Sequence, residues 1–68
     1  MYDYSKLKGR IIEKYGSQKS FAKSINRTGT YVSMVLNGHS LLAQDEIDKW
    51  ADSLEIETDR YGAYFFAR

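Results

Sequence analysis

Apolar residues recur at intervals of three and four positions along most of this chain, which is the spacing that places them on one face of an α-helix. The clearest case lies in residues 44–54, where the apolar positions are Ile47, Trp50, Ala51 and Leu54. The pattern predicts a helix over these residues with the apolar stripe facing the core. We expect Trp50 to be buried, and an acidic outer face formed by Asp45, Asp48, Asp52 and Glu55.

A first helix is predicted to run to about Tyr15, with Asp3 or Ser5 as its N-cap. Gly16 is expected to end this helix, because glycine readily takes the left-handed backbone that follows many helices. Gly9 lies inside the helix and costs about 1 kcal/mol relative to alanine. It therefore either permits a close approach of another helix or is a local weakness.

Residues 18–38 predict two short helices, at about 18–25 and 29–37, separated by a polar turn. Asn26 suits the exit from the first of them, because Asn tolerates the left-handed backbone better than other non-glycine residues. Thr28 can cap the second helix and Gly38 can end it. Apolar residues have helical spacing on both sides of the turn, at Phe21, Ala22 and Ile25 and then at Val32, Val35 and Leu36.

The spacing within this segment is specific. Counting from Gln18, the small Ala22 is fifth, the turn residue Asn26 is ninth and the β-branched Val32 is fifteenth. Apolar residues hold the fourth, eighth and eighteenth places, and Asn37-Gly38 closes the segment. The arrangement resembles, without a gap, the helix-turn-helix of the Cro and phage-repressor (lambda repressor-like) family. The resemblance implies one all-α domain over residues 1–68, with five helices of which the second and third form the helix-turn-helix.

The C-terminal segment predicts a short fifth helix from Thr58 or Asp59 to about Phe66. It is rich in aromatic residues, and one helix face cannot bury all of them in so small a domain. Either most of them close the core beneath the first helix, or some form an exposed patch for a homodimer or another partner. The residues concerned are Tyr61, Tyr64, Phe65 and Phe66.

Composition excludes several classes of protein. The chain has no cysteine and one histidine, so it lacks a disulfide framework and a set of metal ligands. It has no glycine-rich phosphate loop and no nucleophile with a matching base, so we expect neither an enzyme nor a cofactor or small-molecule ligand. No apolar run has the length of a membrane span and the start does not resemble a signal peptide, so a cytoplasmic location is expected. The resemblance to the phage-repressor family implies that this cell is a host bacterium.

Charge is divided unevenly along the chain. Residues 1–44 carry seven Lys and Arg against two Asp and Glu, a balance of +5, whereas residues 45–68 carry three against seven, a balance of −4. The basic half contains the helix-turn-helix, which fits a surface that faces the phosphates of double-stranded DNA. The alternative is that both halves are solvated helix faces.

The resemblance also implies how DNA would be bound in the major groove. Its base edges would meet the outward face of the second motif helix, with Tyr31 at the groove wall; the other residues of this face are Gly29, Thr30, Ser33 and Met34. The phosphates would be bound at both ends of the motif, by Gln18, Lys19, Arg27 and Thr28 and by Asn37, His39 and Ser40.

This sequence departs from the family at the residues that read bases. Arg, Gln and Asn are the strong readers, and the leading positions of the second motif helix have none. An alternative therefore stays open: an anti-repressor, similar to the modulators of repression of temperate phages, that binds a phage repressor protein. Its contact surface would be Tyr31, Met34 and Leu36, or the C-terminal aromatic residues. The DNA-binding antidote of a toxin pair ranks last, because no toxin-binding tail is present.

Overall fold

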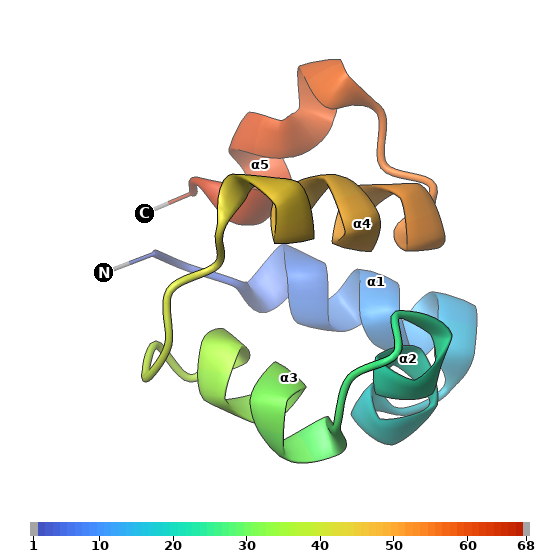
Figure 1. Ribbon diagram of the computed structural model, residues 1–68. Helices are drawn as coiled ribbons and strands as arrows, with labels where there is room; N and C mark the ends of the chain where they lie inside the picture. The colour runs from blue at the N-terminus through green and yellow to red at the C-terminus, as the bar shows by residue number, and fades with distance from the viewer. Residues whose placement is uncertain (1, 68) are drawn as a thin grey trace.

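The computed structural model describes residues 2–67, and it confirms the predicted all-α fold. Within this range the chain forms five α-helices and one 3₁₀ helix, and no strand. The helices are α1 (Ser5–Tyr15), α2 (Gln18–Ser24), α3 (Gly29–Leu36), α4 (Gln44–Leu54), the 3₁₀ helix η1 (Thr58–Arg60) and α5 (Tyr61–Phe65) (Figure 1).

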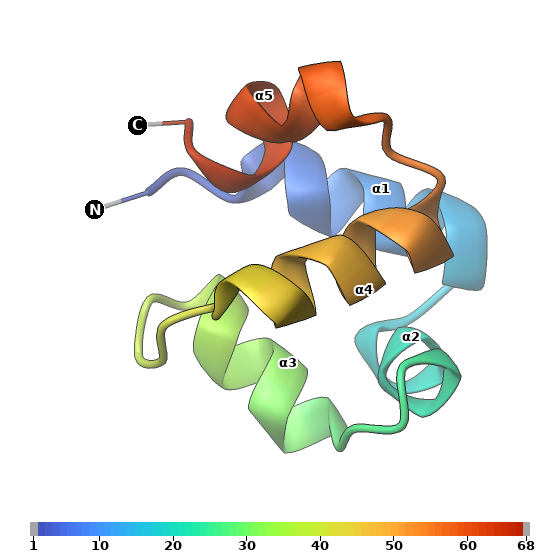
Figure 2. The ribbon, with the colours of Figure 1, turned by 45° about the horizontal axis from the view of Figure 1, so that its top comes forward.

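Helices α1 and α4 form the middle of the molecule. In two views, α5 lies on one side of this pair, and α2 and α3 lie on the other (Figures 1 and 2). The first and last described segments lie side by side, because the backbone N–H of Asp3 donates to the carbonyl of Ala67 over 2.6 Å. The helix-turn-helix is thus supported from behind by the two central helices.

The core is built from the stripes that the sequence predicts. Trp50 is fully buried at its centre, and its ring meets that of Phe21 edge-on with 4.9 Å between centroids. Every helix except η1 contributes to the core; its buried apolar residues are Leu7, Ile11, Phe21, Ala22, Val32, Val35, Leu36, Ile47, Trp50, Ala51, Leu54, Ile56 and Phe65.

The predicted helix signals act as expected at the motif. The hydroxyl of Thr28 accepts a hydrogen bond from the backbone N–H of Tyr31 over 3.1 Å, which caps α3. Asn26 has the predicted left-handed backbone, with φ +60°, and Gly38 has φ +80° after α3. The prediction that Asp3 or Ser5 is the N-cap of α1 is wrong, because the N-cap is Tyr4, which makes no side-chain cap hydrogen bond. Asp3 lies one residue earlier, and its Oδ1 accepts the N–H of Ser5 over 2.9 Å.

Two residues assigned to partner surfaces lie in the core instead. Phe65 is buried, so the prediction that it belongs to a dimer or partner interface is wrong; its ring packs edge-on against Tyr61 at 5.5 Å. Leu36 is also buried, which removes it from the proposed protein-contact surface of α3. Both side chains are large and apolar, and removing such a side chain from water is favourable by about 1.5–3 kcal/mol.

Candidate DNA- and protein-binding surface

Helices α2 and α3 form a helix-turn-helix of the predicted shape. Ala22 and Val32 are both buried where the helices meet. The turn is fixed by the backbone N–H of Arg27, which donates to the carbonyl of Ala22 over 2.8 Å. The two helices also approach closely at Gly29, because a Cβ added there would lie 3.7 Å from Cα of Lys19. Gly29 therefore faces α2 and offers no side chain to a ligand.

The outward face of α3 is small, uncharged and partly apolar. Thr30 and Met34 are exposed. Ser33 is half-buried, and its hydroxyl accepts a hydrogen bond from the side-chain amide of Asn37 over 3.2 Å. A thymine methyl or an apolar side chain of a protein could meet Met34, whereas this face has no guanidinium or amide directed outward from α3 to discriminate bases.

The residues predicted to bind phosphate lie at both ends of this face. Lys19 is exposed at the start of α2, beside the half-buried Gln18, and Asn37 follows α3. His39 is exposed in the loop after α3, and its backbone N–H donates to the carbonyl of Met34 over 2.9 Å. Ser40 is half-buried in the same loop. Their contacts with DNA stay a prediction, and the geometry is compatible with it.

Arg27 differs from the other predicted phosphate ligands, because an acidic side chain of α4 already binds it. Its guanidinium lies 2.5 Å from Oε1 of Glu46. The carboxylate is 7% exposed, whereas the side chain of Arg27 is 45% exposed. Lys49 approaches the other oxygen of Glu46 at 3.6 Å. The cation in the motif turn is therefore neutralised within the protein.

Tyr31 completes this cluster, with contacts to both Glu46 and Arg27. Its hydroxyl donates to Oε1 of Glu46 over 3.4 Å, and the guanidinium of Arg27 lies over its ring at 4.9 Å from the centroid. Burial, with the nearby Glu46 carboxylate, raises the pKa of Tyr31 above 10.0. The hydroxyl of Tyr31 is therefore turned toward α4, and a contact of Tyr31 with DNA stays a prediction.

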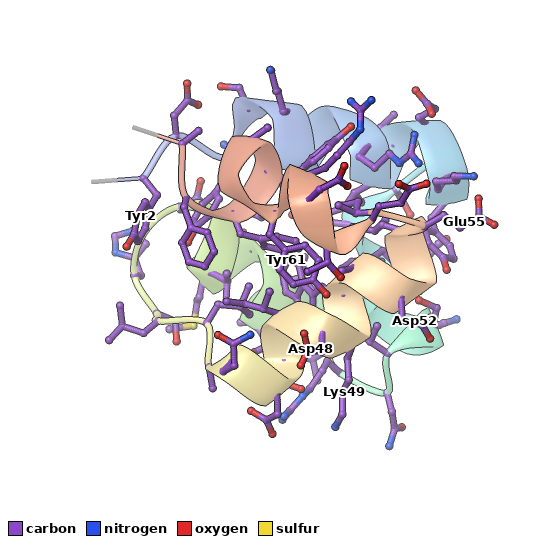
Figure 3. All side chains as sticks on the ribbon, turned by 90° about the horizontal axis from the view of Figure 1, so that it is seen from above. Tyr2, Asp48, Lys49, Asp52, Glu55 and Tyr61 are labelled. Carbon is purple, nitrogen blue, oxygen red and sulfur yellow. The ribbon has the colours of Figure 1, made fainter. Side chains whose placement is uncertain are left out.

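Glu46 is a functional candidate that the sequence pattern did not single out. It was counted only in the charge balance, although it lies four residues before Trp50 and therefore on the edge of the buried stripe of α4. The acidic residues predicted to face outward do so: Figure 3 shows Asp48 and Asp52 along α4, with Lys49 between them.

A second surface lies where the chain ends meet the loop after α3. Leu41 is 92% exposed, and Phe66 is 44% exposed with its ring edge-on to Tyr2 at 6.0 Å. Beside them is a groove of about 240 Å³, lined largely by apolar atoms of Tyr2, Tyr4, Gly38, Ser40 and Leu41. Of the four aromatic residues predicted to form an interface, Phe66 is thus exposed, and Tyr61 and Tyr64 are half-buried.

Residues 2–67 contain no group of three or more His, Cys, Asp or Glu side chains placed to hold a metal ion. Within the same residues, every helix is too short or too polar to cross a membrane.

Comparison with known proteins identifies the family. A search of curated proteins found no match. Among solved structures, the chain is similar to the modulator of repression (MOR) of the temperate bacteriophage TP901-1 from Lactococcus lactis, with 40% identity and a TM-score of 0.85. The match covers 96% of this chain and 88% of that one, so this chain resembles a phage regulator over nearly its whole length. Residues 1–68 match the family described as "Protein of unknown function (DUF739)", and the chain belongs to that family.

Proposed function

We propose that this protein modulates repression in a temperate phage by binding a repressor protein. The observation that carries the proposal is the similarity to the phage modulator of repression at 40% identity over 96% of the chain. That similarity favours the anti-repressor alternative over an operator-binding protein of the Cro type. The protein would act in the host cytoplasm, where a phage repressor works.

The surface of the motif supports a protein partner. Helix α3 presents Thr30 and Met34 without a charge, and the nearest cation of the turn, Arg27, is bound to Glu46. A DNA-binding face depends on cations that replace counterions along the phosphates, and this face has few. Exposed apolar side chains such as Met34 suit a protein interface, since methionine adapts to the shape of its neighbour.

The second surface offers a further contact region for the same partner. Leu41 and Phe66 are large, exposed and apolar, and they lie beside the groove between the N-terminal segment and the loop after α3. Aromatic anchors carry a large share of the binding energy at many protein interfaces. The proposal therefore assigns repressor binding to Met34, to the surface formed by Leu41 and Phe66, or to both.

The test is titration calorimetry with the repressor of a temperate phage that carries this protein. Saturable binding at a fixed stoichiometry, with release of the repressor from a labelled operator, is the expected result. Met34→Ala and Phe66→Ala should separate the two surfaces, because both side chains are exposed and their removal should leave the fold intact. Ile12→Ala, which removes an exposed apolar side chain from α1, is the matched control. Absence of binding by the folded wild-type protein contradicts the proposal.

A second candidate is an operator-binding regulator of the Cro type, and the geometry of α2 and α3 favours it. Its partner would be the major groove of double-stranded DNA, read by a homodimer. The test is selection from a randomised duplex pool at about physiological salt, where non-specific binding is weak. Enrichment of a two-fold symmetric site would support this candidate, and a pool without enrichment would count against it.

A further inference from the structure

We propose that Glu46 determines what the helix-turn-helix can bind, by holding Arg27 against α4 and so withdrawing the cation of the turn from DNA phosphate. The inference goes beyond the proposed repressor partner, because it concerns whether the cation of the turn is available to DNA. It rests on the cluster of Arg27, Tyr31, Glu46 and Lys49, in which three elements of the fold meet.

The first argument is the geometry around the carboxylate. Oε1 of Glu46 is contacted by the guanidinium of Arg27 at 2.5 Å and by the hydroxyl of Tyr31 at 3.4 Å. Oε2 has Lys49 at 3.6 Å. Each oxygen of the carboxylate therefore has a cationic neighbour, so Glu46 is paired on both sides.

The second argument is burial. Glu46 is 5% exposed, and it is the only charged residue among the buried residues that the structure describes. A carboxylate in such a place is costly unless it is paired, and removing one partner of a buried pair leaves that cost uncompensated. A phosphate that captured Arg27 would impose this cost on α4. Lys49, at 3.6 Å, would be the cation left beside the carboxylate.

The third argument is the orientation of the guanidinium. The ring of Tyr31 lies beneath Arg27 with 4.9 Å between the guanidinium carbon and the ring centroid. This cation–π contact adds to the ion pair in fixing the side chain on the α4 side of the turn. A phosphate that drew the guanidinium away from α4 would break both contacts, whereas the exposed Lys19 at the start of α2 carries no such restraint among the contacts that the structure shows.

The consequence is a motif with the shape of a DNA-binding element, in which the cation of the turn is paired with a carboxylate of α4. DNA affinity without sequence preference depends on the number of phosphates that cations neutralise. If Arg27 neutralises no phosphate, binding to every duplex is weaker by that one contact. The uncharged face of α3 then stays available to a protein. Glu46 thus acts as a specificity-determining residue without contacting the partner.

The experiment measures binding to a labelled duplex of random sequence by fluorescence anisotropy, from low to about physiological salt. Glu46→Gln keeps the size of the side chain and removes its charge. We expect tighter binding and a salt dependence steeper by about one unit of log K against log salt, which is the contribution of one phosphate contact. Asp45→Asn, which removes a neighbouring exposed charge of the same helix, is the matched control and should not give the full change.

Arg27→Ala supplies the decisive comparison. In the Glu46→Gln background it should abolish the added salt dependence, whereas in the wild-type background it should change neither affinity nor slope. Lys19→Ala, made in the wild-type background, should reduce the slope of log K against log salt by up to about one unit. If Arg27→Ala flattens the wild-type slope as well, Arg27 already binds phosphate and the proposal is overturned.

Folding of the variants is checked by thermal unfolding. If Glu46→Gln does not fold, Glu46→Asp serves instead, because it keeps the charge and withdraws it from Arg27 by one methylene; a smaller gain in DNA binding is then expected. A folded Glu46 variant without any gain at low salt overturns the proposal. Failure of the wild-type protein to bind a repressor would leave this DNA result standing, so the two proposals fail separately.

Discussion

The guanidinium of Arg10 on α1 donates from Nε to the backbone carbonyl of Leu54, 2.9 Å away at the end of α4. A second hydrogen bond of 3.1 Å runs from the same side chain to the carbonyl of Glu55, where the backbone is left-handed with φ +56°. The last carbonyls of a helix have no partner within it. Arg10 therefore caps α4 and joins the two central helices.

Replacing Arg10 by alanine should lower the free energy of unfolding by about 1–3 kcal/mol, because the carbonyls lose a charged donor in a half-buried place. Urea unfolding followed by far-UV circular dichroism measures the change. Glu13→Ala breaks the ion pair of Arg10 with Glu13, and it should cost below about 1 kcal/mol, since that pair is exposed. An equal loss in both variants would contradict the capping role.

Much of the helix-turn-helix could be predicted from sequence because its signals are local. A cap such as Thr28 acts on a backbone N–H three residues away, and Asn26 sets its own backbone angle. The stripe around Trp50 likewise needs only the period of a helix. These features depend on neighbours in sequence, so a single sequence is sufficient to reveal them.

The remaining features depend on contacts between distant segments. The burial of Glu46 on α4 depends on its ion pair with Arg27, which lies in the turn between α2 and α3. The burial of Phe65 and the exposure of Phe66 depend on the phase of α5, and the 3₁₀ helix before it rotates each residue further than an α-helix does. Periodicity cannot fix that phase in a helix of five residues.

Gly9 and Gly16 should respond to alanine in opposite directions. At Gly9 a Cβ would meet no atom within 4 Å, so the close helix approach considered for it does not occur. Gly9→Ala should raise the free energy of unfolding by about 0.5–1 kcal/mol through helix propensity. At Gly16 the backbone has φ +81°, which is unfavourable for alanine, so Gly16→Ala should lower the free energy of unfolding by about 1–2 kcal/mol. Thermal unfolding of both variants checks the signs.

Phe65→Ala and Phe66→Ala should separate a core residue from a surface residue. Truncation of the buried Phe65 should lower the free energy of unfolding by about 3–5 kcal/mol, which can unfold so small a domain. Phe66 packs on Tyr2 at the surface, and its loss should cost below about 1.5 kcal/mol, the range of an aromatic pair. Chemical denaturation gives both values. A folded Phe65→Ala variant of wild-type stability would place the side chain outside the core.

Val32→Ala tests the packing of the motif itself. The side chain is fully buried in the angle between α2 and α3, so its truncation should cost about 1–3 kcal/mol through lost contacts and an incompletely closed space. Thr30→Ala with Met34→Ala removes two exposed side chains of the same helix and should leave the unfolding midpoint nearly unchanged. The reverse order of the two midpoints would place the outward face of α3 in the core.

Stability should fall in mild acid, and Glu55 should contribute to the loss. A hydrogen bond and ion pair with Lys14 lower the pKa of Glu55 below its usual 4.5. Since the carboxylate is ionised more readily in the folded state, its contribution is complete above the unfolded pKa and disappears as the pH falls through the folded one. The stability difference between wild type and Glu55→Gln should therefore be largest near neutral pH and shrink below about pH 4.5. Urea unfolding across this range measures it, and Glu57→Gln controls for loss of one exposed carboxylate. A difference that is independent of pH would show that the Lys14 contact does not stabilise the folded protein.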